Sequence, residues 1–441
     1  MNLFHLIEQS FCSLANPAHI EVGLSGGLDS VVLLHLLVRL RERHDFVLTA
    51  VHVHHGLSAH ADEWAVFCQR YCDDWEVPLR IVRVKIEKNG LGVEAAARAA
   101  RYAAFSDGQS NILALAHHQD DQIETFMLAV LRGGGVRAMA AMPPLRNLNG
   151  KAQIWRPLLA VTRLGLAAYA QEHGLAYVED ESNRDSAYLR NWLRHEALPH
   201  MRQRVPHLDG HILANVRSAQ DDLALLDEIT AADYAQVCAD GGFALDKWRG
   251  LSAPRRRRLL REFVVRQGAA VPSQGSIWDF ERVLAQAQTG EWRLADADVF
   301  AYRNRLFLLK RNSDCSYPWA VGGGLKGRLK DVLQENGFVL QPCEAGWDGS
   351  VLITEGIIRS VDNTDSIFLG FGHKSVKKLL QESHILPFVR KKWPIITNAD
   401  GECLAVANLR TSKDFRASPG VLPVYQPLSV YLGEPNPTIG V

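Results

Sequence analysis

Hydrophobic and polar positions in the first two hundred residues follow two alternating periods. Short runs of five to nine residues, rich in branched apolar side chains, alternate with stretches of 12 to 17 residues whose apolar positions recur with helical spacing. We expect strands at 19–24, 46–54, 79–86 and 112–116, and helices at 30–43, 62–75, 93–109 and 120–131. Strands that alternate with helices of this length predict an α/β fold with a doubly wound parallel sheet.

The α/β pattern is expected to end near residue 206. Helical spacing then dominates, with one hairpin expected at 292–294 and 299–309, before a Gly/Pro-rich stretch at 314–324. Beyond it, a small α+β domain is predicted, with strands at 351–354, 357–361, 395–397 and 404–407 and a helix near 374–382. We therefore predict a catalytic domain at 1–206, a mainly helical domain at 207–312, a linker at 313–324 and a C-terminal domain at 325–441.

Composition narrows the class of protein without identifying it. The 441 residues are 47% hydrophobic and 22% charged, which excludes a disordered chain, a collagen and a coiled coil. The 49 Lys and Arg residues balance 49 Asp and Glu residues, so the chain is no polycation. The charge is segregated, however, because 218–246 is acidic whereas 254–266 and 370–416 are basic.

The cysteines and the apolar runs indicate a reducing cytoplasm. Seven scattered cysteines without a C-x-x-C pair predict neither a disulfide framework nor a zinc ribbon. The N-terminal sequence MNLFHLIEQSFCSL suggests an amphipathic helix and has no basic start or small-residue cleavage site. The most apolar run, 31–40, contains His35 and Arg39 and is too short to cross a membrane.

The sharpest local motif is a glycine loop between the first strand and the helix after it. Its six residues are Ser25, Gly26, Gly27, Leu28, Asp29 and Ser30. Adjacent glycines allow close backbone approach, and free N–H groups at a helix N-terminus bind phosphate. Asp29 could hold Mg²⁺ or orient a nucleophile, and the lysine of a Walker-type loop is absent. The alternative is an exposed Ser/Gly turn.

A second motif brings acids and histidines to the same edge of the predicted sheet. Asp121 and Glu124 are three residues apart on a helix and therefore share a face, while His117 and His118 follow a strand. The acids could hold an ammonium group, accept a proton or help to bind Mg²⁺. The alternative is an ordinary helix N-terminus with acidic residues in its first turn. No zinc is expected, because the nearby 52–55 histidines alternate faces and lack a cysteine partner.

Several arginines could meet an anionic ligand. Arg98 and Arg101 lie on an Ala-rich helix, where they could neutralise phosphate, stack on a base or simply face solvent. Arg190 and Arg194 are four residues apart and would share a helix face after an Asx-rich segment at 182–185.

These motifs together resemble a known family. The glycine loop is similar to the PP-loop of the ATP pyrophosphatase superfamily, in the adenine-nucleotide alpha-hydrolase-like fold. Further segments resemble, in order, the signatures of bacterial tRNA(Ile)-lysidine synthetases: HVHHGL at 52–57, GVEAAARAARY at 92–102, AHHQDDQIET at 116–125, RPLL at 156–159 and EDESNRD at 179–185. The resemblance covers roughly residues 20–200 and resumes at 372–414.

The resemblance implies a two-step ligation. ATP would adenylate C2 of the wobble cytidine of the tRNA(Ile) with anticodon CAU, and free lysine would then displace AMP to form lysidine. It assigns the reacting site to Asp29, Arg98, His117, Asp121, Glu124 and Arg190, and ATP binding to the six loop residues. Asp29 is the expected Mg²⁺ ligand. For the tRNA we expect weaker contacts from Arg194, Lys374, Lys377, Lys378, Arg390, Lys391 and Lys392, with Trp393 as a nearby aromatic. A monomer or homodimer is expected.

Three alternatives stay open at this point. A tRNA thiolase would need reactive thiolates, but Cys68 and Cys72, the nearest pair, lie on a predicted helix away from the motifs. A small-molecule amidoligase would leave the basic C-terminal region without a role. A non-catalytic tRNA-binding protein would not need the intact glycine loop and acidic motif. The run Arg255–Arg258 is either an RNA-binding surface or a solvated helix face.

Overall fold

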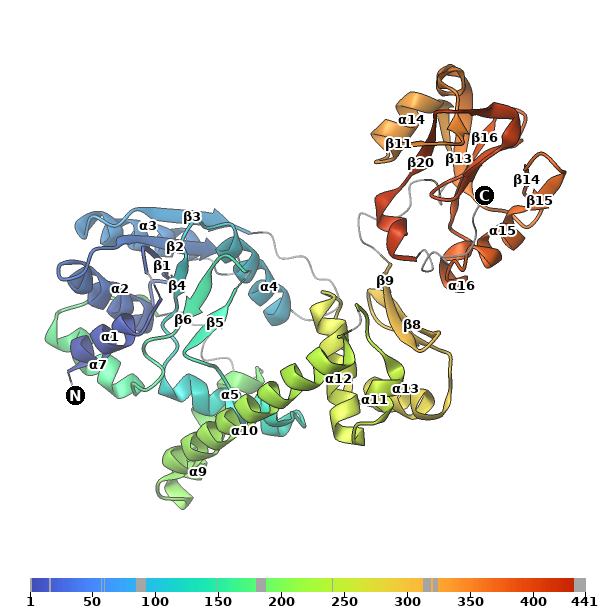
Figure 1. The fold of residues 1–441 in the computed structure, drawn as a ribbon. Coiled ribbons are helices and arrows are strands. Elements are labelled where there is room, and N and C mark those ends of the chain that lie inside the picture. The colour runs from blue at the N-terminus through green and yellow to red at the C-terminus, as the bar shows by residue number, and fades with distance from the viewer. Residues whose placement is uncertain are drawn as a thin grey trace. The chain divides into compact units, whose positions relative to one another are not determined.

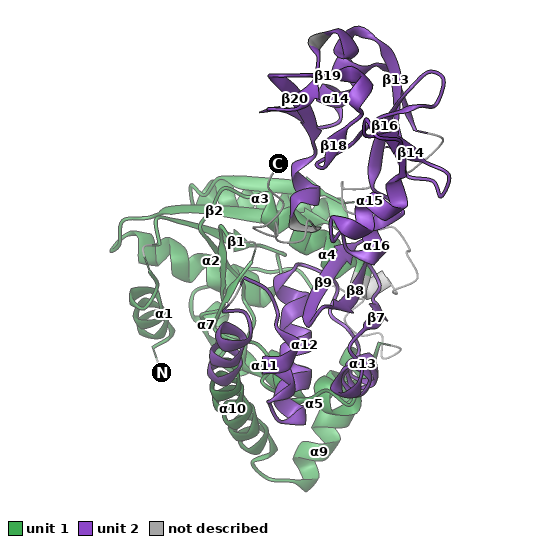
Figure 2. Cartoon of the chain, turned by 45° about the vertical axis from the view of Figure 1, so that its right-hand side comes forward, with its two compact units in different colours: residues 1–227 green, residues 228–441 purple. Residues whose placement is uncertain are grey.

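Figure 1 shows the fold in a computed structural model, which describes residues 2–15, 17–56, 58, 60–84, 93–148, 150–179, 188–239, 241–311, 319 and 324–431. The chain divides by its internal contacts into two compact units, Met1–Asp227 and Glu228–Val441 (Figure 2). Each unit is described by itself. The finer domain boundaries at 206, 312 and 324 stay predictions.

The first unit is built on a mostly parallel sheet, as predicted. Its strands among the described residues are β1 (His19–Gly23), β2 (Val47–His54), β3 (Leu79–Arg83), β4 (Ile112–Ala114), β5 (Leu145–Asn147) and β6 (Gln153–Trp155). They run in the order β3-β2-β1-β4-β6-β5, and only β5 pairs antiparallel. The sequence pattern missed β5 and β6, because three-residue strands are too short to show a period.

Helices cover both faces of this sheet, which confirms the doubly wound fold (Figure 1). The helices α1 (Leu3–Cys12), α2 (Leu28–Arg41), α3 (Ala61–Asp74) and α7 (Arg163–Glu172) pack on one face, and α4 (Val93–Ser106) packs on the other. The helix α2 is buried on nearly every side because it contacts the sheet, α1 and α7. This position explains the apolar run at 31–40 without a membrane.

Further helices of the first unit lie beyond the end of β4. They are α5 (Gln119–Leu131), α6 (Val136–Met139), α8 (Leu189–Trp192), the π-helical turn η2 (Leu193–Ala197), α9 (Leu198–Arg204) and the part of α10 (Leu208–Val237) that precedes Glu228. A small core of Ile123, Leu198, Ile212 and Val216 joins α5, α9 and the start of α10. This core fixes the side of α5 that carries the acidic motif.

The second unit begins with helices packed on a three-stranded sheet. The helices α11 (Leu245–Arg249), α12 (Ala253–Arg266) and α13 (Gln274–Gln286) accompany β7 (Gly290–Arg293), β8 (Ala297–Tyr302) and β9 (Arg305–Lys310). The predicted second strand of the hairpin was wrong, because it is split by a tight turn at Arg303 and Asn304. Both residues have positive φ, at 46° and 64°, as two-residue hairpin turns require.

The C-terminal part of this unit consists of antiparallel sheets with short helices. One sheet orders β10 (Leu325–Arg328), β13 (Glu355–Ser360), β16 (Pro394–Asn398), β17 (Cys403–Val406) and β18 (Arg410–Thr411). A second orders β11 (Val339–Cys343), β20 (Gly420–Val424), β12 (Gly346–Trp347) and β19 (Arg416–Ala417). The hairpin β14 (Ser366–Phe368)–β15 (His373–Ser375) and helices α14 (Leu329–Glu335), α15 (Val376–Glu382) and α16 (Pro387–Arg390) complete it.

Two sequence expectations for this part have clear outcomes. The α+β class is confirmed, but the strand predicted at 351–354 was wrong, because those residues fall largely in the 3₁₀ helix Gly349–Ile353. Throughout the described ranges, no helix combines the length and the hydropathy that crossing a membrane demands.

Candidate active site

The glycine loop joins β1 to α2 and leaves the start of that helix open. Gly26 has φ of +86°, and a side chain there would press against Val178 and Cys68. The Ser30 hydroxyl donates to the Gly27 carbonyl at 2.9 Å and accepts from the Ser25 N–H at 3.2 Å. The first turn of α2 has no side-chain cap. Its N–H groups can therefore bind an anion.

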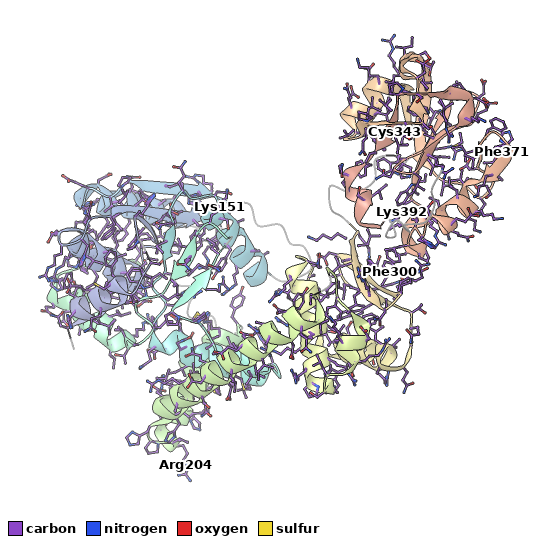
Figure 3. The ribbon with its side chains drawn as sticks, viewed as in Figure 1. Lys151, Arg204, Phe300, Cys343, Phe371 and Lys392 are labelled. Carbon is purple, nitrogen blue, oxygen red and sulfur yellow. The ribbon has the colours of Figure 1, made fainter. Side chains whose placement is uncertain are left out.

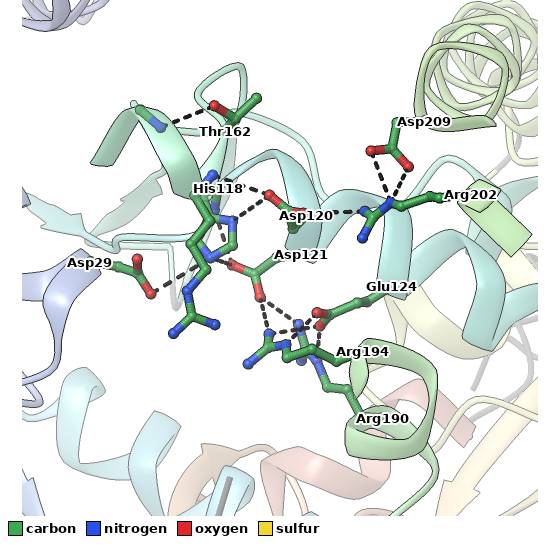
Figure 4. Close-up of polar contacts among 12 residues, drawn as sticks. Asp29, His118, Asp120, Asp121, Glu124, Thr162, Arg190, Arg194, Arg202 and Asp209 are labelled. Carbon is green, nitrogen blue, oxygen red and sulfur yellow. Dashed lines mark hydrogen bonds and ion pairs between the residues drawn. The ribbon is translucent and has the colours of Figure 1, made fainter. Parts of the chain in front are cut away.

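His118 is the hub of the acidic motif. It is 2% exposed, and its Nε2 lies 3.6 Å from Asp29 Oδ2 and 3.5 Å from Asp121 Oδ2, while Nδ1 lies 3.7 Å from Asp120 Oδ2 (Figure 4). Burial alone would lower the pKa of His118, but the contacts with Asp29, Asp121 and Asp120 outweigh it and raise the pKa. This imidazole connects the glycine loop to α5.

Asp121 and Glu124 share one face of α5, as the spacing predicted. Arg190 Nη2 donates to Asp121 Oδ1 at 2.8 Å, and Arg190 Nε donates to Glu124 Oε2 at 2.7 Å. Arg194 Nε donates to Glu124 Oε1 at 2.6 Å (Figure 4). Burial would raise the pKa of Asp121, yet His118 and Arg190 hold it below its usual value. Asp121 is therefore ionised, and both acids are paired with arginines.

The two arginines that contact the acids lie on segments of different helical type. Arg190 lies on α8, and Arg194 lies in the π-helical turn η2. Such turns are rare and occur frequently at functional sites. Arg194, which the sequence associated with tRNA, lies among the carboxylates, and its role in tRNA binding stays a prediction. The Asx-rich residues 182–185 lie outside the described residues.

His117 faces a different environment from its neighbour. Burial lowers its pKa to about 3; Asp121 opposes this effect, and the charges of Arg156, Arg190 and Arg101 add to it. Within the described residues its Nδ1 is buried without a hydrogen-bond partner. His117 is therefore a neutral imidazole beside the acids, and His118 makes the ionic contacts.

Arg98 belongs to a second, cationic cluster around Tyr102. The guanidinium carbons of Arg98 and Arg146 lie 5.3 Å and 5.4 Å from the Tyr102 ring centre. Burial lowers the pKa of Arg156, while Tyr102 raises it and Arg146 and Arg98 lower it further. Three arginines close enough to repel one another suit an anionic ligand. The sequence pattern missed Arg146, which lies in the unpredicted strand β5.

A small cleft opens beside the acidic motif. It has a volume of about 40 Å³, and it is lined by His118, Asp120, Glu124, Arg163, Arg194, Leu198 and Arg202. Asp120 accepts from the Arg163 backbone N–H at 3.1 Å and from Arg202 Nη2 at 3.3 Å. Both signs of charge line this cleft. The sequence pattern placed His118 in the motif, but the reacting histidine was assigned to His117. The pattern missed Asp120, which lies inside the motif, and Arg202 as site residues.

One oxygen in the site fits a metal ligand. Asp29 Oδ1 is buried without a partner among the described residues, whereas Oδ2 faces His118. A single carboxylate together with substrate phosphates is the usual way in which proteins hold Mg²⁺. No group of three or more potential metal-binding side chains occurs in the described ranges. His52 Nδ1 instead lies 2.9 Å from the Leu24 carbonyl oxygen.

The arginines of the basic run on α12 pair with side chains of their own unit. Arg255 pairs with Asp233 of the acidic stretch, and Arg256 Nη2 lies 2.6 Å from Glu281 Oε1. Arg258 Nε donates to Thr230 Oγ1 at 2.5 Å. The structure therefore favours an internal role for this run over an RNA surface.

The expected C-terminal tRNA contacts are largely accessible, with one correction. Lys377, Lys378, Lys391 and Lys392 are exposed, whereas Lys374 pairs with Glu382 and Arg390 Nε donates to the Ile385 carbonyl at 2.7 Å. Trp393 was wrongly expected as an available aromatic. It is fully buried and donates to the Ala407 carbonyl at 3.0 Å, because β16 begins beside it in the core.

Comparison with known proteins identifies the family. A PP-loop domain family matches residues 3–201, a TilS substrate binding domain matches 243–307, and a TilS substrate C-terminal domain matches 367–424. The tRNA(Ile)-lysidine synthase of Neisseria meningitidis serogroup B is 47% identical over 410 residues, covering 93% of this chain and 96% of the relative. That of Chromobacterium violaceum is 38% identical over 446 residues, covering 96% and 98%.

A solved structure with partial likeness is the U34-tRNA thiolase of Methanococcus maripaludis with its iron–sulfur cluster, at a TM-score of 0.42 and 18% identity over 50% of this chain and 78% of that one. The family matches and the full-length relatives agree with the glycine loop and the acidic motif. This chain belongs to the tRNA(Ile)-lysidine synthase family.

Proposed function

We propose that this protein converts the wobble cytidine of the tRNA(Ile) with anticodon CAU into lysidine, using ATP and free lysine, through a C2-adenylated base. The observation that carries the proposal is the link His118 makes between the glycine loop and the acids of α5, at 3.6 Å from Asp29 and 3.5 Å from Asp121. This link supports a site in which the open end of α2 would bind an anion beside acids that would bind an ammonium group. Family membership supports the same activity.

In the first step, the cytidine C2 oxygen attacks the α-phosphorus of ATP, and the bond to the pyrophosphate oxygen breaks. The open first turn of α2, with Ser25 and Ser30, would bind the phosphates. Asp29 would hold Mg²⁺, which when bound neutralises phosphate charge. The arginines around Tyr102 would stabilise negative charge on the leaving group or on the RNA backbone.

In the second step, the lysine ε-amine attacks C2, and the bond between C2 and the AMP oxygen breaks. The amine must first lose a proton, and Asp121 or Asp29 would accept it. The cleft at Asp120 offers Arg163 and Arg202 to the lysine carboxylate and Glu124 to an ammonium group. Because Glu124 already has two arginine partners, an incoming ammonium competes with them.

Cys68 was wrongly expected to lie away from the motifs, because it packs beside Gly26 of the glycine loop, but neither its thiol nor that of Cys72 suits sulfur transfer. Cys68 and Cys72 are fully buried, and burial raises the pKa of each thiol to about 12. A thiol with such a pKa is not a thiolate near neutral pH.

The reaction also needs an RNA base taken out of its stack, which agrees with a tRNA substrate. We place the enzyme in the cytoplasm as a monomer or homodimer.

The proposal is tested by product analysis. Purified protein with ATP, lysine and tRNA(Ile) transcript should release AMP and pyrophosphate, and nucleoside mass spectrometry should show lysidine. Asp121→Asn should abolish modification, because Asp121 is proposed to accept a proton. It should leave tRNA affinity within a few-fold, because Asp121 is not among the proposed tRNA contacts. Asp227→Asn is the matched control, since this half-exposed acid pairs with Arg137 at the surface. Equal AMP yield without lysine and tRNA, or incorporation of sulfur, would contradict the proposal.

A further inference from the structure

The hairpin between β14 and β15 presents a phenylalanine that nothing in the described chain covers. Phe371 is 100% exposed at the tip of this hairpin and points outward (Figure 3). It lies between Gly370 and Gly372, whose φ values are +96° and +138°. A side chain at Gly370 would collide with Lys413. The local sequence is thus restricted to glycine on both sides, and the ring between them projects into solvent.

The surroundings of Phe371 are cationic. Lys413 Nζ lies 5.3 Å from the ring centre, and the Ser412 hydroxyl donates to the Phe368 carbonyl at 3.3 Å, which fixes this lysine to the hairpin. Contact with Lys374 of β15 and the charges of Lys378 and Arg410 lower the pKa of Glu382. Three cations therefore lie near this one acid, and one of them belongs to the hairpin itself.

We propose that Phe371 stacks on an unpaired or helix-terminal base of the tRNA, with Lys413 and its basic neighbours holding the adjacent phosphates. An exposed ring among lysines is how proteins bind single-stranded nucleic acid, because bases offer π-faces and the backbone offers charge. An apolar protein partner would leave these cations unpaired. The inference rests on the proposed function, since that function supplies the RNA.

Substitutions at one position separate stacking from apolar contact. We measure affinity of the full chain for tRNA(Ile) transcript by fluorescence anisotropy at several salt concentrations. Phe371→Ala should raise Kd by roughly 5- to 100-fold, the loss of one stacked base, and should leave the slope of log Kd against log salt unchanged. Phe371→Trp should bind within about two-fold of wild type, and Phe371→Leu should bind as weakly as the alanine variant.

Two further variants serve as comparisons. Lys413→Ala should reduce the salt slope by about 0.7, as expected for one lost phosphate contact with a single strand. Ile353→Ala removes another exposed apolar side chain of this domain, 67% exposed, and should leave Kd unchanged. The Phe371 variants should fold as wild type does, because Phe371 is fully exposed, and Ile353→Ala should do so because Ile353 is largely exposed.

The outcomes are decisive in either direction. Wild-type affinity in Phe371→Ala, with an active wild-type enzyme, overturns the stacking inference and leaves the proposed function standing. Equal binding by the Leu and Trp variants overturns stacking in favour of simple apolar contact, as a protein partner would make. A wild-type protein that binds no tRNA overturns the proposed function together with this inference.

Discussion

Glu124→Gln is the substitution that examines the acidic motif most directly. Glu124 is 1% exposed and accepts from Arg190 Nε at 2.7 Å, from Arg194 Nε at 2.6 Å and from Arg194 Nη2 at 2.9 Å. Glutamine keeps the volume but removes the charge. It also turns an amide NH₂ toward guanidinium N–H groups, so donors face donors in a buried place.

The magnitude follows from this burial. Breaking a buried ion pair by removing one partner costs about 3–5 kcal/mol, because the other charge loses its compensation. Glutamine retains one acceptor oxygen, so we expect a loss of about 3 kcal/mol. For a unit of this size that corresponds to a fall of roughly 6–12 °C in Tm. Lysine incorporation should fall at least about 100-fold, because the proposed ammonium site loses its charge.

The assay combines calorimetry with a double-mutant cycle. Scanning calorimetry of the full chain is run on wild type, Glu124→Gln, Arg194→Gln and the double variant, and lysidine formation is measured on each. A coupling energy of about 1–3 kcal/mol is expected between the two positions. Glu196→Gln, an exposed acid of the same π-helical turn, should be neutral. A Tm for Glu124→Gln within 2 °C of this control, or zero coupling to Arg194, would refute the reasoning.

Two further predictions follow from individual contacts. The pKa of His118 is raised in the folded protein, so the stability that its protonated form contributes should be complete below pH 6.5 and lost as the pH rises through the pKa of the folded state. The pKa of His117 is lowered to about 3, so His117 should instead reduce the stability of the folded protein as the pH falls below 6.5. Urea unfolding of His118→Gln and His117→Gln against wild type should show these opposite trends, and parallel curves would contradict them. Arg256→Ala should lower the free energy of unfolding by about 1–3 kcal/mol, because it breaks a part-buried ion pair with Glu281. The slope of log Kd for tRNA against log salt should stay unchanged. A slope reduced by about 0.7 would assign Arg256 to phosphate binding.

Much of the fold and part of the site could be predicted from local pattern. Alternating periods predicted the parallel sheet, and the glycines after β1 predicted the turn that leads into α2. The spacing of Asp121 and Glu124 placed both on one face of α5. Each of these features depends on residues within a few positions of one another, so the local sequence pattern predicts them.

Distant partners could not be predicted in the same way. Arg190 and Arg194 lie 66 and 70 residues from Glu124 in the sequence. The helical period of α5 does not show which other element will pack against its acidic face. The same holds for Arg255, whose partner Asp233 lies on another helix, and for Trp393, whose burial depends on the sheet that closes over it. Where a strand ends, adjacent side chains turn into different environments, which is why His118 rather than His117 meets Asp29.

By itself, then, the sequence determined the class of fold, the glycine turn after β1 and the local geometry of the acidic helix, because periodicity and turn chemistry act over short range. Only the tertiary structure decided which charges are neutralised, which histidine has a raised pKa and which aromatic is exposed. Burial and long-range pairing set those properties, and both depend on elements that meet only when the chain is folded.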